Sequence, residues 1–257
     1  MKITVLTENT GLPGFRTEHG LSLYLETSGH RILFDTGQTS LFAENADLLH
    51  VDLAAVDLCV LSHGHYDHGG GLSTFLERNQ RAKIYMSRYA FGAYYNGTEK
   101  YIGLTAALKG NERIVLTDGV TALAPHLTLY SCNDRPTHLD LGSFGLTKHI
   151  DGKFVPDDFL HEHYLLIEEN GRRFLISGCS HKGIINIEEW FRPDVLIGGF
   201  HFVKLPPDDT LAGLARLLDA YSTDYYTCHC TGTEQYAYMK KYMKHLHYLS
   251  TGQTIEL

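Results

Sequence analysis

The chain has 257 residues, of which 43% are hydrophobic, so it can bury a sizeable core, and we expect one compact domain over residues 1–257. Its formal net charge of −8 argues against a broad cationic surface for nucleic acid or acidic lipid, so neither is an expected partner. The absence of a secretory signal, of a run of about 18 apolar residues and of any CxxC pair predicts a cytoplasmic protein with reduced thiols. The oligomeric state is not indicated.

The first part of the chain alternates strand-like and helix-like segments, which is typical of a sheet with helices packed on it. Strands are expected at 2–7, twice within 21–37, at 56–62 and at 82–87. Helices are expected at 39–50 and 70–79.

The middle of the chain is less regular. Residues 88–112 are rich in tyrosine and interrupt the alternation, either as an aromatic wall for a ligand or as an amphipathic helix packed on the sheet. Short strands return over 113–132, and the Gly/Asp-rich connection at 139–160 is long enough to be a functional loop or lid. Residues 163–181 read as a hairpin with Asn-Gly in its turn.

The last part alternates helices and strands, and its strands end in polar clusters. Helices are expected at 183–191, 208–221 and 233–243, with strands at 194–201 and 224–232 and strand material at 248–257. Histidines follow four predicted strands, in VLSHGHYDH, LISGCSH, LIGGFH and YYTCHCTG. Because ligand sites in open α/β sheets gather at the carboxyl ends of strands, we expect these histidines to meet.

The stretch HGHYDH at 63–68 collects four metal-capable side chains in six residues. His63 and His65 can converge on one ion, and Asp67 and His68 on a second. Imidazole and carboxylate ligands suit zinc, manganese or iron, and a catalytic zinc keeps an open position for water. The three glycines that follow, at 69–71, let backbones approach closely at the start of the next helix.

Other strand ends must complete such sites. His229 is the best placed further ligand, and Cys179 is either a thiolate ligand or a buried cysteine beside the metal. His181 is a ligand or a polar site residue, and His201 is a proton-transfer or substrate-contacting residue or a hydrogen-bonded core histidine. His161 and His163 share one strand face and either supply a missing ligand or lie at a solvated edge. Cys228 and Cys230 are expected to be buried structural thiols.

The motifs HGHYDH, ILFDTG, ISGCSH and CHCTG together resemble the metallo-β-lactamase superfamily over nearly the whole chain. EHGLSLYLE, DDFLHEHYLLI and GCSHKGIINI are similar to its dihydropteroate-synthase-like branch, which includes an archaeal dihydropterin-aminobenzene-ribofuranosyl-phosphate synthase. The resemblance implies an α/β fold, a four-layer αββα sandwich with a pair of divalent metal ions at one edge. It also implies that Asp35 holds a structural turn near the site.

The resemblance has two departures. Cys179 stands where the superfamily usually has a metal-bridging carboxylate, and the third histidine of the first metal has no clear counterpart, which leaves His181, His161 or His163. The implied cofactors are two divalent ions, most simply zinc, with manganese or iron as alternatives, held by a common set of ligands. This set is His63, His65, Asp67, His68, Cys179 and His229.

These features lead us to expect a metal-dependent hydrolase or related transferase that acts on a phosphorylated small molecule, with a pterin-like molecule suggested by the branch resemblance. Asp67 and His201 are the expected catalytic residues. His181, Glu162 and Tyr101 are the expected substrate contacts. The alternatives are an iron-loaded redox protein of the same fold and a non-catalytic metal-dependent sensor of small molecules.

Overall fold

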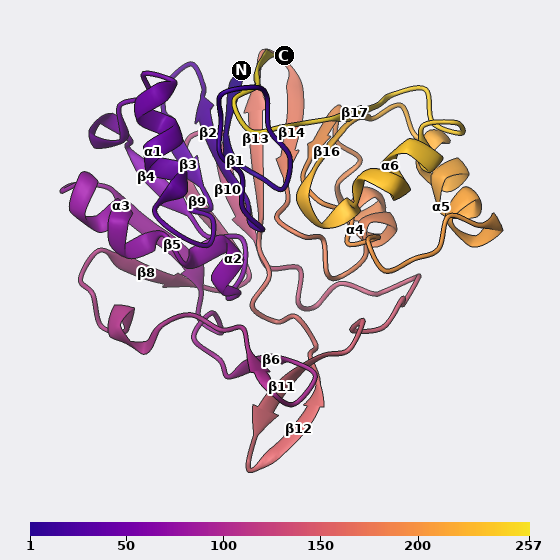
Figure 1. Cartoon of the computed structure of the whole chain (residues 1–257), viewed down its shortest axis with the longest axis horizontal. Coiled ribbons are helices and arrows are strands. Elements are labelled where there is room, and N and C mark those ends of the chain that lie inside the picture. Colours follow the sequence, from indigo (N-terminus) through magenta and orange to yellow (C-terminus); the bar gives the residue numbers. More distant parts are fainter.

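The computed structural model describes residues 1–257 and contains two seven-stranded sheets packed face to face (Figure 1). The first sheet has the order β18 (Thr254–Glu256), β1 (Lys2–Thr7), β2 (Ser22–Glu26), β3 (Arg31–Phe34), β4 (Leu58–Val60), β5 (Lys83–Ser87), β8 (Ile114–Thr117). The second has the order β17 (Leu246–Tyr248), β16 (Asp224–Thr227), β15 (Val195–Ile197), β14 (Arg172–Ile176), β13 (Tyr164–Glu169), β10 (Leu127–Tyr130), β9 (Val120–Ala124).

Helices cover the outer face of each sheet, as Figure 1 shows. The first sheet is covered by α1 (Leu41–Leu48) and α3 (Leu72–Arg78). The second is covered by α4 (Ile184–Phe191), α5 (Asp209–Asp219) and α6 (Thr233–Met239). The expected αββα sandwich is confirmed.

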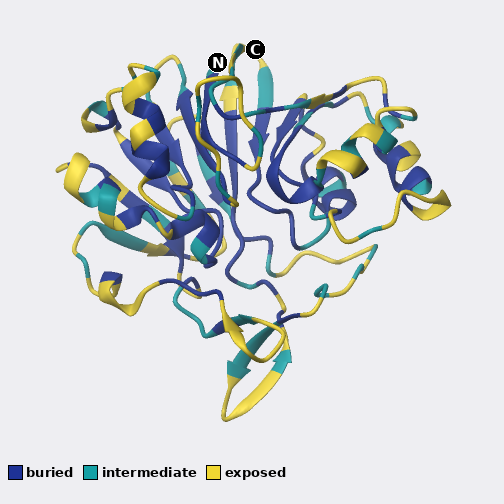
Figure 2. Cartoon of the chain, in the orientation of Figure 1, coloured by how far each residue is buried: buried dark blue, intermediate teal, exposed yellow.

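Strand alternation divides the hydrophobic side chains among three cores. In β13, Leu165 and Ile167 face the core between the sheets, whereas Tyr164 and Leu166 face the helices. In the first sheet, Val60 points inwards and Cys59 outwards. Residues of both kinds are buried, which is why these strands read as continuous apolar runs and appear dark in Figure 2.

The hairpin predicted within 163–181 is present as β13 and β14. Its turn residues Asn170 and Gly171 both have positive φ, at 53° and 75°, the conformation that Asn-Gly favours in two-residue turns. Two sequence-based boundaries differ from the structure. Helix α6 ends at Met239, and the segment after it contains a further strand, β17, which pairs in parallel with β16.

The Tyr-rich segment and part of the expected lid meet in one small sheet, so the Tyr-rich segment is not the amphipathic helix that was one of its two expected forms. This sheet has the order β12 (Lys153–Pro156), β11 (Leu146–Ile150), β6 (Tyr94–Asn96), β7 (Lys100–Tyr101). The lid region is therefore largely a hairpin, turning at Asp151 and Gly152 with φ of 50° and 78°, and the Tyr-rich segment contains strands and no α-helix. The Asp-Gly pair between the short runs LTKHI and KFVP is the hairpin signal in the sequence.

The strands that precede the histidine clusters are parallel to their neighbours. Strands β3, β4 and β5 are parallel in one sheet, as are β14 to β17 in the other. Their carboxyl ends therefore meet at one edge of the sandwich.

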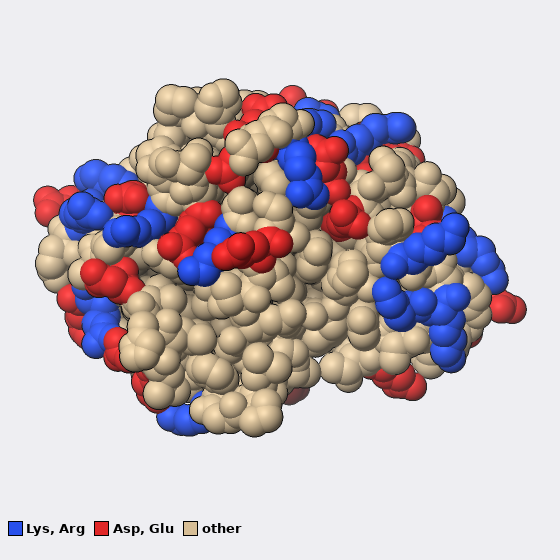
Figure 3. All heavy atoms as spheres, turned by 90° about the horizontal axis from the view of Figure 1, so that it is seen from above, with Lys and Arg blue, Asp and Glu red and all other residues tan.

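The edge that carries both termini shows Lys and Arg gathered at one end of the view and mixed with Asp and Glu elsewhere (Figure 3). None of the helices has the length and apolar character needed to cross a membrane.

Candidate metal centre

The HGHYDH stretch leaves the end of β4 and forms a one-turn helix, α2 (Tyr66–Gly69). At Gly70 and Gly71 the backbone then passes so close to the loop after β3 that there is no room for a side chain. A Cβ atom on Gly70 would lie 2.1 Å from the carbonyl oxygen of Gln38, and one on Gly71 would lie 2.3 Å from that of Thr36. The expected close backbone approach is confirmed, and it fixes α2 against the loop that follows β3.

Asp35 orients two of the histidines through hydrogen bonds to His68 and Ser62. Its Oδ1 accepts a hydrogen bond from the backbone N–H of Ser62 at 2.7 Å. Its Oδ2 accepts from Ser62 Oγ and lies 2.7 Å from His68 Nδ1. Because Ser62 Oγ uses its proton on Asp35, it accepts from His63 Nδ1, 2.9 Å away. The Nε2 atoms of His63 and His68 therefore face the centre, the outer-shell pattern of metal-binding histidines, and Asp35 has the structural position implied by the sequence.

One cluster of donor atoms joins the end of β16 to α2. His68 Nε2 lies 3.3 Å from His229 Nε2 and 3.2 Å from Cys179 Sγ. Asp67 Oδ2 lies 3.5 Å from His229 Nε2 and 3.9 Å from His68 Nε2. The cluster thus comprises Asp67, His68, Cys179 and His229.

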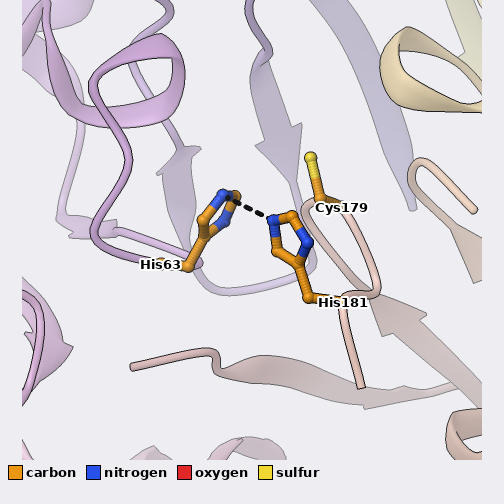
Figure 4. Close-up of side chains that lie close together, drawn as sticks. All are labelled: His63, Cys179 and His181. Carbon is orange, nitrogen blue, oxygen red and sulfur yellow. Dashed lines mark hydrogen bonds between the residues drawn. The ribbon is translucent and has the colours of Figure 1, made fainter. Parts of the chain in front are cut away.

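A second cluster contains His63, Cys179 and His181. The Nε2 atoms of His63 and His181 lie 3.3 Å apart, and Figure 4 shows a nitrogen of each ring pointing at the other, with the Cys179 side chain beside His181. The ring of His65 stands 4.6 Å from that of His63 and 5.1 Å from that of His181. Cys179 belongs to both clusters, so its sulfur lies where a shared ligand would be needed.

These separations suit metal ions. Ligands at about 2.0 to 2.3 Å from a tetrahedral zinc are about 3.3 to 3.8 Å apart. Two imidazole lone pairs held 3.3 Å apart, as between His63 and His181, repel each other unless a proton or a cation lies between them. The donor set therefore fits divalent ions, with a thiolate that favours zinc or iron over magnesium.

Electrostatics favour a cation as well. Burial would raise the pKa of Asp67, but His68 and the neighbouring rings of His19 and His229 hold it well below its usual range. Burial would lower the pKa of His68, but Asp35 and Asp67 raise it, so this position attracts a proton that an ion would displace. Burial raises the pKa of Cys179 and lowers those of His63 and His181, so without a cation these three are neutral.

Two of the three candidates for the missing ligand, His161 and His163, have ring nitrogens that contact other groups. His161 Nδ1 accepts from the Gly64 N–H at 2.9 Å, so its Nε2 must carry the proton that is donated to Asp157 at 3.1 Å. A neutral ring so arranged has no free lone pair for an ion. His163 faces Thr117, with Nδ1 3.5 Å from the hydroxyl. His181 Nε2 lies 3.3 Å from His63 Nε2, whereas His161 lies with His65 and Asp157 in a separate group of metal-capable side chains.

The other expected site residues divide into two groups. His201 lies at the centre, its ring 4.4 Å from that of His181, and its Nδ1 is buried without a partner. Burial lowers its pKa to about 3, so the metal-free ring is neutral near pH 7.

Glu162 and Tyr101 do not face the centre, which differs from the sequence-based expectation. Glu162 is fully buried, and its carboxylate accepts from the backbone N–H groups of His181 and Lys182 and from the Tyr164 hydroxyl. It holds the turn that presents His181. Tyr101 is exposed on β7 and donates its hydroxyl to the Leu104 carbonyl. Strand alternation turns it away from the cavity that its neighbours Lys100 and Ile102 line.

Two adjoining cavities lie at the centre. The smaller, about 180 Å³, is lined by Asp67, Cys179, His181 and His229 of the two clusters and by Lys100 and Lys204. The larger, about 450 Å³, is lined by His181 and His201, by Phe144, Phe159 and Phe200, and by the 139–144 segment. Phe159 stacks on His181 with ring centroids 4.5 Å apart.

Sequence reasoning missed several site residues. They are Asn9, His19, Asp157, Lys100 and Lys204. His19 Nε2 lies 3.2 Å from Asp67 Oδ2, and Asp157 Oδ2 lies 3.9 Å from His65 Nε2. Only the EHG triplet at His19 and the DD pair ahead of HEH carried a local signal, because the others depend on chain segments that meet only in the fold.

The family model described as "Metallo-beta-lactamase superfamily" matches residues 16–223. The chain belongs to this superfamily. It is 31% identical to the uncharacterized protein MJ0448 of Methanocaldococcus jannaschii over 90% of each chain. It is 27% identical to 7,8-dihydropterin-6-methyl-4-(beta-D-ribofuranosyl)-aminobenzene-5'-phosphate synthase of the same organism, over 94% of this chain and 91% of that one.

Among solved structures, Tm1679, described as a metal-dependent hydrolase of the beta-lactamase superfamily, aligns with a TM-score of 0.86 and 26% identity, covering 100% of this chain and 99% of that one. Zinc-bound PqqB from Methylobacterium extorquens shares the fold, with a TM-score of 0.59 and 11% identity over the full length of both chains. The resemblance to the superfamily and to the branch that includes the pterin-related synthase is confirmed.

Proposed function

We propose that this protein is a metal-dependent hydrolase of a small phosphate-bearing molecule. The observation that carries the proposal is the small cavity, in which Lys100 and Lys204 line the same space as the candidate ligands Asp67, Cys179, His181 and His229. Lys204 Nζ donates to the Phe144 carbonyl at 2.6 Å, and Lys100 Nζ to the Tyr66 hydroxyl at 3.1 Å. Each amine retains N–H donors for a phosphate, which both lysines and metal ions attract.

The proposed cofactors are two divalent ions, with zinc favoured by the shared thiolate. His63 and His181, with the nearby His65, would hold the first ion, and Asp67, His68 and His229 would hold the second, with Cys179 available to either. When bound, such ions supply Lewis acidity, which lowers the pKa of water and balances charge on a phosphoryl oxygen.

The chain's own groups have separate roles in this proposal. Asp67 Oδ2 orients the attacking water as a hydrogen-bond acceptor. Lys100 and Lys204 neutralise the phosphate, and the half-buried His201 faces the leaving group. Its neutral ring offers a hydrogen bond there, and a proton only after the substrate's negative charge raises its pKa.

A pterin-related transferase is the second candidate. It is supported by the 27% identity to the archaeal synthase and by the larger cavity, whose phenylalanine rings suit a flat heterocycle. On either candidate the protein would act in the cytoplasm, on a small molecule and without nucleic acid.

The test begins with metal content per chain by inductively coupled plasma mass spectrometry, on protein purified without added metal or chelator. The protein is then assayed against phosphomonoesters, phosphodiesters and pterin phosphates. Two zinc ions per chain with phosphate release support the hydrolase. Two iron ions with redox activity would replace it by the redox alternative, and ligand-induced thermal stabilisation without turnover would favour the sensor.

The lysines provide the specific control. Lys100→Met and Lys204→Met should each raise KM for a phosphorylated substrate about 10- to 100-fold, the loss of one charge-assisted hydrogen bond. Lys153→Met, at the exposed tip of the β11–β12 hairpin, removes the same charge away from the cavity and should leave KM unchanged. Equal effects of all three substitutions would refute the phosphate assignment.

A further inference from the structure

Asn9, just after β1, lies between two imidazole rings at the metal centre. Its Oδ1 is 2.7 Å from His229 Nδ1, and its Nδ2 is 3.3 Å from His19 Nδ1. The same segment anchors the backbone at this point, because Glu8 accepts a hydrogen bond from the His229 N–H at 3.1 Å. One amide thus contacts two histidines that come from opposite ends of the chain.

The chemistry of the amide fixes both protons. An amide oxygen only accepts, so His229 Nδ1 must donate, and the lone pair of His229 then lies on Nε2, towards Asp67 and His68. An amide nitrogen only donates, so His19 Nδ1 must accept, and a neutral His19 then carries its proton on Nε2. That N–H points at Asp67 Oδ2, 3.2 Å away.

The reverse orientation of the amide does not fit the cluster. With Nδ2 against His229, Nδ1 of that ring would accept and its Nε2 would carry the proton. That proton would point at the ligand cluster, and His229 could not bind an ion. Only the orientation in the structure presents the His229 lone pair and, at the same time, a donor for the Asp67 carboxylate.

We propose that Asn9 is a positioning residue that sets the tautomers of two histidines, making His229 a metal ligand and His19 the donor that holds Asp67 for the second ion. The inference rests on the proposed metal site but not on the substrate. Asp67 is nearly buried, with 12% of its side chain exposed, whereas the His19 side chain is 58% exposed. His19 thus lies between Asp67 and the solvent.

The direct test is the protonation of the rings in the metal-free protein. Nitrogen-15 NMR of labelled protein, with His19→Gln and His229→Gln to assign the signals, should show His229 protonated at Nδ1 and His19 at Nε2 at a pH where both are neutral. His19 protonated at Nδ1, or His229 at Nε2, would overturn the inference.

Two substitutions separate the two contacts of Asn9. Asn9→Leu removes both, and it should weaken binding of the second zinc about 10- to 100-fold, as loss of an outer-shell partner does. Asn9→Asp keeps an acceptor for His229 but cannot donate to His19, so His19 Nδ1 becomes the donor and its Nε2 lone pair faces the ion. His19, Asp67 and His229 lie close enough together to share one ion, so the ligand gained offsets the lost hydrogen bond to Asp67, and this variant should bind at least as tightly as the wild type.

Cobalt substitution reports the change in coordination. In Asn9→Asp the visible absorption of bound cobalt should weaken as His19 adds a nitrogen ligand, and Asn9→Asp with His19→Phe should restore the wild-type spectrum. Asn111→Asp places the same charge in a half-buried loop away from the centre and should match the wild type in zinc affinity and spectrum. Identical affinities for the leucine and aspartate variants, or an unchanged spectrum in Asn9→Asp, would refute the inference whether or not a phosphate substrate is found.

Discussion

Asp35→Asn tests whether one buried carboxylate holds the centre together. The carboxylate is fully buried, its Oδ1 accepts from the Ser62 N–H, and its Oδ2 faces Ser62 Oγ and His68 Nδ1, each contact at 2.7 Å. In asparagine one oxygen becomes an NH₂ group, so in either orientation at least one of these donors meets another donor.

The cost follows from the number of bonds that change. Hydrogen bonds to a charged group contribute about 1.5 to 3 kcal/mol each, and a buried donor left unpaired costs about 1 to 3 kcal/mol. With one bond lost and the others weakened, the free energy of unfolding of the metal-free protein should fall by about 2 to 4 kcal/mol. If the amide nitrogen faces His68, that ring must protonate Nε2, and its lone pair no longer faces the centre.

The assay is urea unfolding in the presence of a chelator, followed by metal content after reconstitution. Asp52→Asn is the matched control, because Asp52 is an exposed cap of the short 3-10 helix Leu53–Ala55 and asparagine caps equally well. It should change the free energy of unfolding by less than about 0.5 kcal/mol. An equally small change in Asp35→Asn, with metal content unaltered, would refute this account of Asp35.

Other predictions concern the thiol, a buried acid, the core and the metal. Cys179→Ser should reduce zinc content after dialysis against a weak chelator, since a hydroxyl is a poorer ligand than a thiolate; full retention of both ions would place Cys179 outside the ligand set. Burial raises the pKa of Glu188 from 4.5 to about 7, so the folded state binds the extra proton and stability falls as pH rises from about 4.5 to 7. Glu188→Gln keeps the Thr223 hydrogen bond but carries no titrating proton. Its free energy of unfolding in urea, relative to that of the wild type, should therefore rise by about 1 to 3 kcal/mol between pH 5 and pH 8. Parallel pH profiles for the two proteins would contradict this. Leu165→Ala, in the core between the sheets, should cost about 2 to 5 kcal/mol in the same assay. Chelation of the purified protein should lower Tm, restored by zinc, because the clustered ligands exist only in the folded chain.

The sequence by itself determined the layers of the fold. Apolar runs such as VDLCVLS and HYLLIEEN carry side chains for both faces of a buried strand, and Asn170-Gly171 marks its turn by the positive φ that these residues tolerate. HGHYDH also marked the centre without the fold, because metal-capable residues this close in sequence are close in space. Asp151-Gly152 carries the same kind of hairpin signal, although several other glycines surround it in the sequence.

Only the tertiary structure decided how the centre is completed. His161, His163 and His181 were equal candidates by sequence, and they were separated by what each ring's second nitrogen contacts: the Gly64 N–H for His161, Thr117 for His163 and none for His181. Glu162, expected at the substrate, instead holds the turn of His181. The contact of Asn9 with His229 joins residues 220 positions apart. Local patterns specify which residues can bind an ion. Strand order and the loops between strands determine which of these residues point at the same place. The reason is that packing, and not spacing along the chain, sets the distances between remote segments.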